Sequence, residues 1–218
     1  MDFEDEINKV VEDYLKNISE DQALLRKGLT EKNWHKIESL FDEAVKKYQQ
    51  ALYDGCIETC EQLLTIEPEH FSTLCYLGVS LYHKTNYPLA IDVLTKCIKE
   101  DPEACFLWQF RGDCFRRIGE YSKSIQDYEK ALQLEENGST LDCLAMSEYH
   151  LGNLNNAYMY IDKAISSENH SDIPMLRKAQ FLEAEGKIKE ALLQYEKTVE
   201  KFPLSEYSKN KIIELTYK

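Results

Sequence analysis

Two cysteines and five histidines carry the side chains best suited to chemistry in this sequence. Cys56 and Cys60 lie four residues apart, a spacing that puts two potential metal ligands on one helix face. No nearby His or Cys pair completes a tetrahedral site, so packing is the favoured interpretation of this pair. The histidines show no HExxH spacing and lie in no nucleophile motif; they are His35, His70, His83, His150 and His170. Since Gly-rich phosphate loops are also absent, the sequence predicts no catalytic residue, metal or cofactor.

The cysteine count and the first residues bear on the cellular compartment. Seven cysteines are an odd number, and six of them fall at helical positions where a small apolar side chain is wanted. The start, MDFEDEINKV, is acidic and lacks an apolar run, and no segment approaches the roughly 20 apolar residues of a membrane span. We therefore expect reduced thiols, a cytoplasmic protein and no membrane insertion.

Composition favours an all-α protein that binds another protein. The 218 residues are 43% hydrophobic, and only eight Gly and five Pro occur, without Val, Ile or Thr runs of period two. The formal charge of −13 disfavours nucleic acid, because phosphate binding needs clustered Lys and Arg. This acidity is accounted for either by solubility alone or by an acidic recognition surface.

Two rows of small residues recur along the chain with a period near 34. One row is Ala44, Gly78, Gly112, Ala145 and Ala179; the other follows twelve residues behind it and is Cys56, Ala90, Ser124, Ala157 and Ala191. Small side chains at two fixed points of each unit let two helices approach closely. The period therefore predicts five stacked helix pairs.

The motif within these units resembles the tetratricopeptide repeat family over roughly residues 37–205. The clearest unit is LWQFRGDCFRRIGEYSKSIQDYEKALQLE, in which Ser124 replaces the usual Ala and the other matching residues are Trp108, Gly112, Tyr121, Tyr128 and Ala131. With Ala44 at position eight, the repeats span 37–70, 71–104, 105–138, 138–171 and 172–205, the fourth being one residue short near Asn137-Gly138. The resemblance implies a right-handed superhelical solenoid of helix pairs.

Segments on both sides of the repeats are expected to be helical. Residues 1–36 are predicted to form amphipathic helices, the first with the apolar stripe Phe3, Ile7, Val10, Val11, Tyr14, Leu15 and Ile18. Residues 206–218 are predicted to form a capping helix with Lys209 and Lys211 outward. Its residues expected to face the last repeat are Tyr207, Ile212, Ile213 and Leu215.

The same resemblance implies where a partner binds. Proteins of this family use the concave surface formed by the first helix of each pair. The residues that this places in the binding groove are Phe41, Val45, Tyr48, Tyr76, Val79, Tyr82, His83, Phe106, Phe110, Asp113, Arg116, Arg117, Met146, Tyr149 and His150. Because exposed aromatic surface is costly in water, we expect something to cover this groove.

A carboxylate clamp for heat-shock chaperone tails is not expected. That clamp needs Lys and Asn at positions five and nine of one unit, Asn at position six of the next, and basic residues beyond. Here those positions hold Phe41, Val45, Tyr76, Phe106 and Phe110. The groove therefore favours apolar cargo, with Arg116 and Arg117 available to pair carboxylates of the partner.

From Leu15 through Leu132 the chain is also similar to the class II chaperones of bacterial type III secretion. The similar stretches are ESLFDEAVKKYQQALYDGCIETCEQL, YLGVSLYHKTNYPLAIDVLTKC and QFRGDCFRRIGEY. Such chaperones usually have three repeats rather than five. The sequence thus predicts a non-enzymatic adaptor or chaperone that binds an apolar or amphipathic segment. The alternative is a scaffold or spacer in a larger assembly, with a groove filled by the chain itself.

Overall fold

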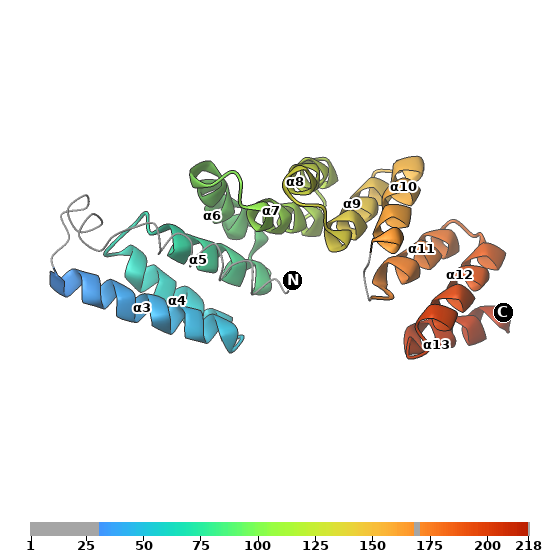
Figure 1. The fold of residues 1–218 in the computed structure, drawn as a ribbon, viewed down its shortest axis with the longest axis horizontal. Helices are drawn as coiled ribbons and strands as arrows, with labels where there is room; N and C mark the ends of the chain where they lie inside the picture. The colour runs from blue at the N-terminus through green and yellow to red at the C-terminus, as the bar shows by residue number, and fades with distance from the viewer. Residues whose placement is uncertain (1–30, 168–170, 218) are drawn as a thin grey trace. The chain divides into compact units, whose positions relative to one another are not determined.

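The computed structural model describes residues 31–167 and 171–217, which contain eleven α-helices and no strand (Figure 1). The all-α prediction is confirmed, whereas the helices predicted within residues 1–30 lie outside the described residues. The helices are α3 (Glu31–Gln49), α4 (Tyr53–Leu64), α5 (Phe71–His83), α6 (Tyr87–Glu100), α7 (Cys105–Arg117), α8 (Tyr121–Leu134), α9 (Gly138–His150), α10 (Leu154–Ser166), α11 (Ile173–Ala184), α12 (Ile188–Lys201) and α13 (Glu206–Thr216). Within these ranges, none of the helices has the length and apolarity needed to cross a bilayer.

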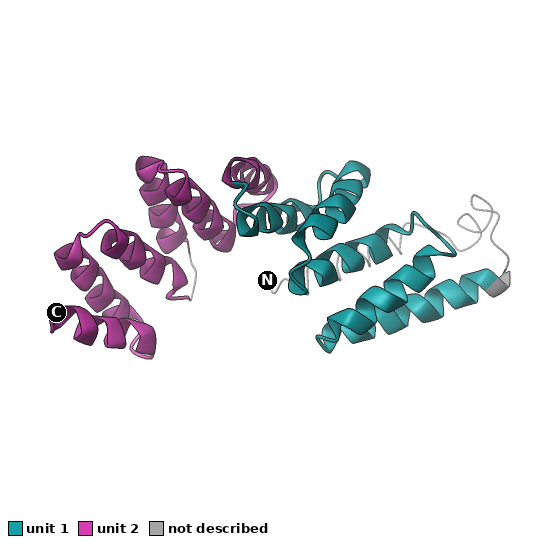
Figure 2. Ribbon diagram, turned by 180° about the vertical axis from the view of Figure 1, so that it is seen from behind, with its two compact units in different colours: residues 1–120 teal, residues 121–218 magenta. Residues whose placement is uncertain are grey.

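The chain divides into two compact units, residues 1–120 and 121–218 (Figure 2). In unit 1, each helix from α3 to α7 packs against the next, and α5 also contacts both α3 and α7. In unit 2, each helix from α8 to α13 packs against the next, and α9 also contacts α11. Alternate helices therefore lie side by side in each unit, which brings together side chains about 34 residues apart.

Both rows of small residues are buried where paired helices meet, as the repeat pattern predicts. Every member of the two rows is buried, from Ala44 and Cys56 in unit 1 to Ala179 and Ala191 in unit 2. At Gly78 the approach is closest, because an added β-carbon would lie 2.9 Å from Cδ2 of Leu94. Small side chains at these points are therefore a steric requirement of the helix pairs.

Two further rows of buried residues could not be recognised from residue type. One consists of Cys60, Leu94, Tyr128, Ile161 and Tyr195, and the other of Leu63, Cys97, Ala131, Ala164 and Thr198. Both recur with steps of 33 or 34 residues on the second helix of each pair. Their members differ in size and polarity, so the fold holds the position constant while the volume filling it varies.

The turn inside each helix pair contains a residue with left-handed backbone geometry. These residues are Ala51 (φ 56°), Thr85 (φ 60°), Gly119 (φ 82°), Gly152 (φ 81°) and Gly186 (φ 74°). Their spacing again follows the repeat. Three glycines adopt this geometry without strain, whereas Ala51 and Thr85 carry a β-carbon that disfavours it.

Replacing Thr85 with glycine is therefore expected to stabilise the protein by about 0.5–1 kcal/mol, because relief of strain exceeds the added entropy of the unfolded chain. The reciprocal change, Gly119→Ala, should destabilise it by about 1 kcal/mol, since nothing lies near the new β-carbon to compensate. Thermal unfolding followed by circular dichroism measures both. Shifts of the same sign would contradict the assignment of strain to these turns.

The C-terminal helix α13 is oriented differently from the sequence prediction. Leu215 is buried and Ile212 packs against the last repeat as expected, but Tyr207 and Ile213 are exposed. Lys211 faces inward, with its Nζ 2.9 Å from Oε1 of Glu183. Residues 211 and 213 are about 200° apart around a helix, so a helix that brings Lys211 to Glu183 turns Ile213 outward. Charge pairing, which the apolar pattern did not reveal, sets this orientation.

Candidate binding surfaces on the first helices of each unit

The predicted groove residues fall on separate faces of the two units. Twelve lie on α3, α5 and α7, and we call this set the unit 1 wall: Phe41, Val45, Tyr48, Tyr76, Val79, Tyr82, His83, Phe106, Phe110, Asp113, Arg116 and Arg117. The other three lie on α9 and form the unit 2 wall: Met146, Tyr149 and His150. Since α5 packs against both α3 and α7, the unit 1 wall comes from three neighbouring helices.

Aromatic rings connect α3 and α5 across the unit 1 wall. The ring of Tyr76 on α5 lies 5.9 Å from that of Phe41 and 5.2 Å from that of Tyr48, both in edge-to-face geometry. Such arrangements add about 0.5–1.5 kcal/mol per pair beyond the area that they bury. Tyr76 therefore holds the first two helices of the wall together.

The same kind of contact continues from α5 to α7. The ring of Phe110 lies 5.0 Å from that of Tyr82 and 6.3 Å from that of His83, again edge to face. Ring contacts thus extend without interruption across all three first helices of unit 1. The spacing of 34 residues predicts this succession, because Tyr48, Tyr82 and Arg116 occupy one register position and Tyr76 and Phe110 another.

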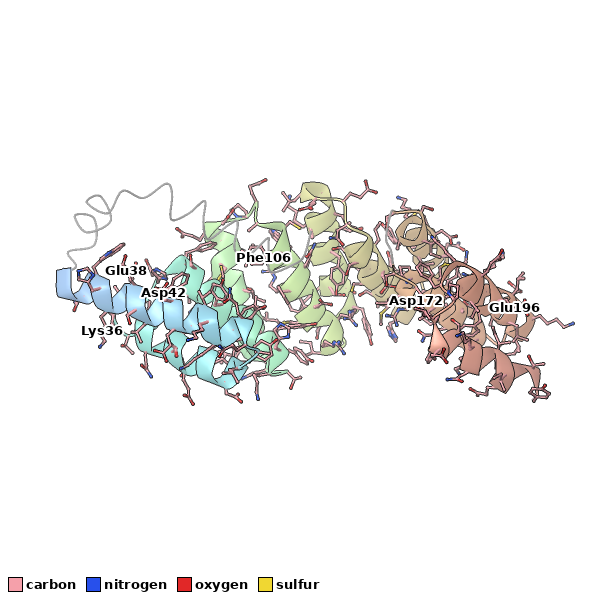
Figure 3. The ribbon with its side chains drawn as sticks, turned by 60° about the horizontal axis from the view of Figure 1, so that its bottom comes forward. Lys36, Glu38, Asp42, Phe106, Asp172 and Glu196 are labelled. Atoms are coloured by element: carbon pink, nitrogen blue, oxygen red, sulfur yellow. The ribbon has the colours of Figure 1, made fainter. Side chains whose placement is uncertain are left out.

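Most of the unit 1 wall is closed to solvent. The buried residues are Phe41, Tyr48, Tyr76, Val79, Phe106 and Phe110; the half-buried ones are Val45, Tyr82, Asp113 and Arg116; and only His83 and Arg117 are exposed. Figure 3 labels Phe106 among the helices of unit 1 and Asp42 along α3. The accessible part of this wall is therefore the edge at the C-terminal ends of α5 and α7.

That edge carries charged and ionisable groups. Arg116 donates a hydrogen bond from Nη2 to Oδ1 of Asp113 at 2.8 Å, which leaves the exposed Arg117 as the more accessible guanidinium. Burial, and next the charge of Asp113, raise the pKa of Tyr82 to about 12. Tyr82 is therefore a neutral phenol at physiological pH, and the edge combines aromatic surface with positive charge.

His83 is held at this edge by a stacked ring on the preceding helix. Its ring lies 4.4 Å from that of Tyr53 on α4, with 9° between the ring planes. Burial against the neighbouring rings lowers the pKa of His83 from its ordinary value near 6.5. The neutral imidazole is thus the form that the fold favours.

This shift predicts acid sensitivity of unit 1. Below pH 6.5 the unfolded chain takes up a proton at His83 before the folded protein does, so stability decreases as the pH falls below that value. His83→Phe keeps an aromatic ring without the titration, and its urea midpoint should change less between pH 7.5 and 5.5 than that of the wild type. An equal change in both proteins would contradict this role of His83.

The unit 2 wall is smaller and is stabilised by rings outside the predicted set. The ring of Tyr149 stacks on that of Phe181 at 4.1 Å, and its hydroxyl donates to the carbonyl oxygen of Phe181 at 3.3 Å. His150 stacks on Tyr121 at 4.8 Å, and Met146 packs on the cluster that contains Phe181. Tyr149 and Met146 are half-buried and His150 is exposed.

Sequence reasoning missed the tyrosines that stack on the two histidines. Tyr53 with His83 and Tyr121 with His150 repeat one contact, made by the first residue of a second helix with the last residue of the next first helix. A Tyr followed by His 29 or 30 residues later was the available signal. It can be interpreted only once the helix ends are known.

The cysteines that could have bound a metal serve in packing. The sulfurs of Cys56 and Cys60 are 3.9 Å apart, and both side chains are fully buried in the core of unit 1. Among the described residues, no group of three or more His, Cys, Asp or Glu side chains has an arrangement that could hold a metal ion. The described walls offer aromatic surface and charge, which are the means of binding another chain.

Comparison with known proteins agrees with the repeat pattern. Residues 105–137 match the tetratricopeptide repeat family model. A solved tetratricopeptide repeat protein from Parabacteroides merdae superposes with a TM-score of 0.72 at 17% identity, covering 84% of this chain and 73% of that protein. The structure of MamA superposes with a TM-score of 0.67 at 22% identity, covering 76% of this chain and 91% of MamA. The chain is a tetratricopeptide repeat protein.

The curated relatives are much longer proteins. Mouse sperm-associated antigen 1 is 31% identical over 101 residues, which are 46% of this chain but 11% of that relative. The chain matches 15% or less of the length of the first curated relatives. The family and its fold are typical of non-catalytic modules that bind other proteins.

Proposed function

We propose that this chain is a non-enzymatic protein-binding module whose unit 1 wall takes an apolar or amphipathic segment of a partner protein. One observation carries the proposal: the aromatic rings of three neighbouring first helices form one connected surface that ends at an edge with His83 and Arg117. Tyr and Arg are enriched at protein interfaces, since both combine apolar contact area with hydrogen bonding.

The chemistry of the edge narrows the partner. Arg117 is exposed and follows Arg116 at the end of α7, so a carboxylate on the bound segment would find a guanidinium beside the aromatic surface. The segment that fits best has apolar residues for the rings and an acidic residue at one end. A chaperone role, including the one suggested by similarity to type III secretion chaperones, would be a special case of this binding.

A photo-crosslinking experiment tests which face binds. Benzoylphenylalanine is placed in the full-length protein at His83, on the edge of the wall, and in a matched control at Lys96, an exposed residue on the second helix α6 of the same unit. Adducts formed in native lysate are identified by mass spectrometry. Binding at the wall predicts a specific protein adduct from position 83 and none from position 96.

The reverse pattern would support the alternative, a scaffold that contacts its assembly through its outer face. Crosslinking from position 96 alone would overturn the assignment of the wall. If position 83 captures a secreted protein that inserts into membranes, the chaperone interpretation gains direct support. Addition of Arg117→Glu to the His83 photoprobe should reduce its yield without loss of helicity, because the side chain of Arg117 is exposed.

A further inference from the structure

Two residues at one register position have very different exposure in the two units. Phe106 and Ile173 both occupy position two of their repeats, in the first turn of α7 and α11. Phe106 keeps 3% of its surface exposed, whereas Ile173 keeps 52%. Both helices lie beside the first helix of the preceding repeat, α5 and α9 respectively. The helix pair itself therefore leaves this position open, and something within unit 1 covers it.

A second register position shows the same difference. Tyr76 and Phe110 occupy position six of their repeats and are buried, with exposures of 2% and 7%. Cys143 and Arg177, at position six in unit 2, are only half-buried. Large rings project further from a helix than cysteine does, so they would be expected to be more exposed at an open position. The cover on unit 1 thus extends over α5 as well as α7.

Unit 1 comprises residues 1–120, and its described helices begin at residue 31. The remaining part of the unit is residues 1–30, whose apolar stripe includes Ile7, Val11 and Tyr14. We propose that residues 3–18 occupy the unit 1 wall as an amphipathic helix and must leave the wall before a partner segment binds there. This inference rests on the proposed function and adds its regulation.

Length and charge both support this occupant. Sixteen helical residues extend about 24 Å. Three first helices spaced about 8–10 Å apart span about 16–20 Å. Residues 1–13 contain six acidic residues and one lysine, a net charge of −5, opposite in sign to Arg117 at the edge of the wall. The segment therefore has the composition that the wall is proposed to select in a partner.

The test changes the stripe in the full-length protein. The double variant Ile7→Asp, Val11→Asp places two carboxylates on the apolar face of the segment. Lys9→Asp is the matched control, because it changes the net charge by the same two units on the opposite helix face. The probe is the fluorescence of 8-anilinonaphthalene-1-sulfonate, and circular dichroism at 222 nm reports retained helicity.

The double variant should bind the dye with several-fold higher emission than either the wild type or Lys9→Asp. A synthetic peptide of residues 1–18 should displace that dye, and Arg117→Glu should weaken peptide binding about fivefold. Unchanged dye emission in the double variant would overturn the proposal. Increased emission that the peptide does not reverse would also overturn it, because the exposed surface would then not be the wall.

Failure of this proposal can be distinguished from failure of the proposed function. If the segment covers the wall, partner crosslinking from position 83 should increase in the double variant. Equal crosslinking in the double variant and the wild type would reject regulation by the segment while leaving binding at the wall intact. Peptide binding without any partner adduct from position 83 would support occupation by the segment and reject the partner site.

Discussion

Replacement of Tyr76 with aspartate is expected to unfold most of unit 1. Tyr76 is almost completely buried and its ring contacts those of Phe41 and Tyr48, so the change removes ring contacts that connect α3 to α5. Loss of a buried aromatic side chain costs about 3–5 kcal/mol, and a buried carboxylate adds several more. The total is comparable to the 5–15 kcal/mol that typically stabilises a domain.

The measurement is the loss of helical signal at 222 nm together with the urea midpoint. Tyr76→Phe is the control, because it keeps the ring and should cost no more than about 1.5 kcal/mol through the lost hydroxyl. A Tyr76→Asp protein with the wild-type midpoint would show that position 76 is not part of the core. Variants at the exposed edge are therefore better tests of partner binding than aspartate at Tyr76 or Phe110.

Replacement of Tyr195 with alanine is expected to destabilise unit 2 by about 3–5 kcal/mol. Its ring is fully buried, within the cluster that contains Ala179, Ala191 and Leu215. Its hydroxyl donates to Oε2 of Glu183 at 2.9 Å. The substitution leaves a cavity between α11, α12 and α13 and removes a donor from a carboxylate that also accepts from Lys211.

Two milder variants separate these contributions. Tyr195→Phe keeps the volume and should cost about 1–2 kcal/mol, the value of a hydrogen bond to a charged group. Lys211→Met should release α13 from Glu183, which would be detected as faster amide exchange in residues 206–216. If Tyr195→Ala costs no more than Tyr195→Phe, packing at this position contributes little and the prediction is wrong.

The helical fold and its main packing contacts could be predicted from the sequence with considerable detail. The two rows of small residues recur at a fixed period, and steric exclusion allows few alternatives at Gly78, where a β-carbon would lie too close to Leu94. Residue size therefore carried the information. The rows that contain Cys60 and Tyr128 carried none of this kind, because a buried position of this fold accepts either a small or a large side chain.

The candidate site was predictable as a set of residues but not as a surface. Register placed Phe106, Tyr76 and Phe110 on one face, yet their burial depends on what else in unit 1 packs against them. Similarly, the apolar pattern of residues 206–218 did not reveal that Lys211 pairs with Glu183 and turns Ile213 outward. Contacts between segments far apart in sequence decide exposure, and a local periodicity does not contain them.

The sequence by itself therefore determined the repeat, the helix pairs and the residues that share a face, because these follow from side-chain size and the geometry of a single helix. Only the tertiary structure decided that His83 stacks on Tyr53, that the wall of unit 1 is closed while Ile173 in unit 2 is open, and that Arg117 remains at the exposed edge. The physical reason is that burial and charge pairing depend on neighbours from other helices.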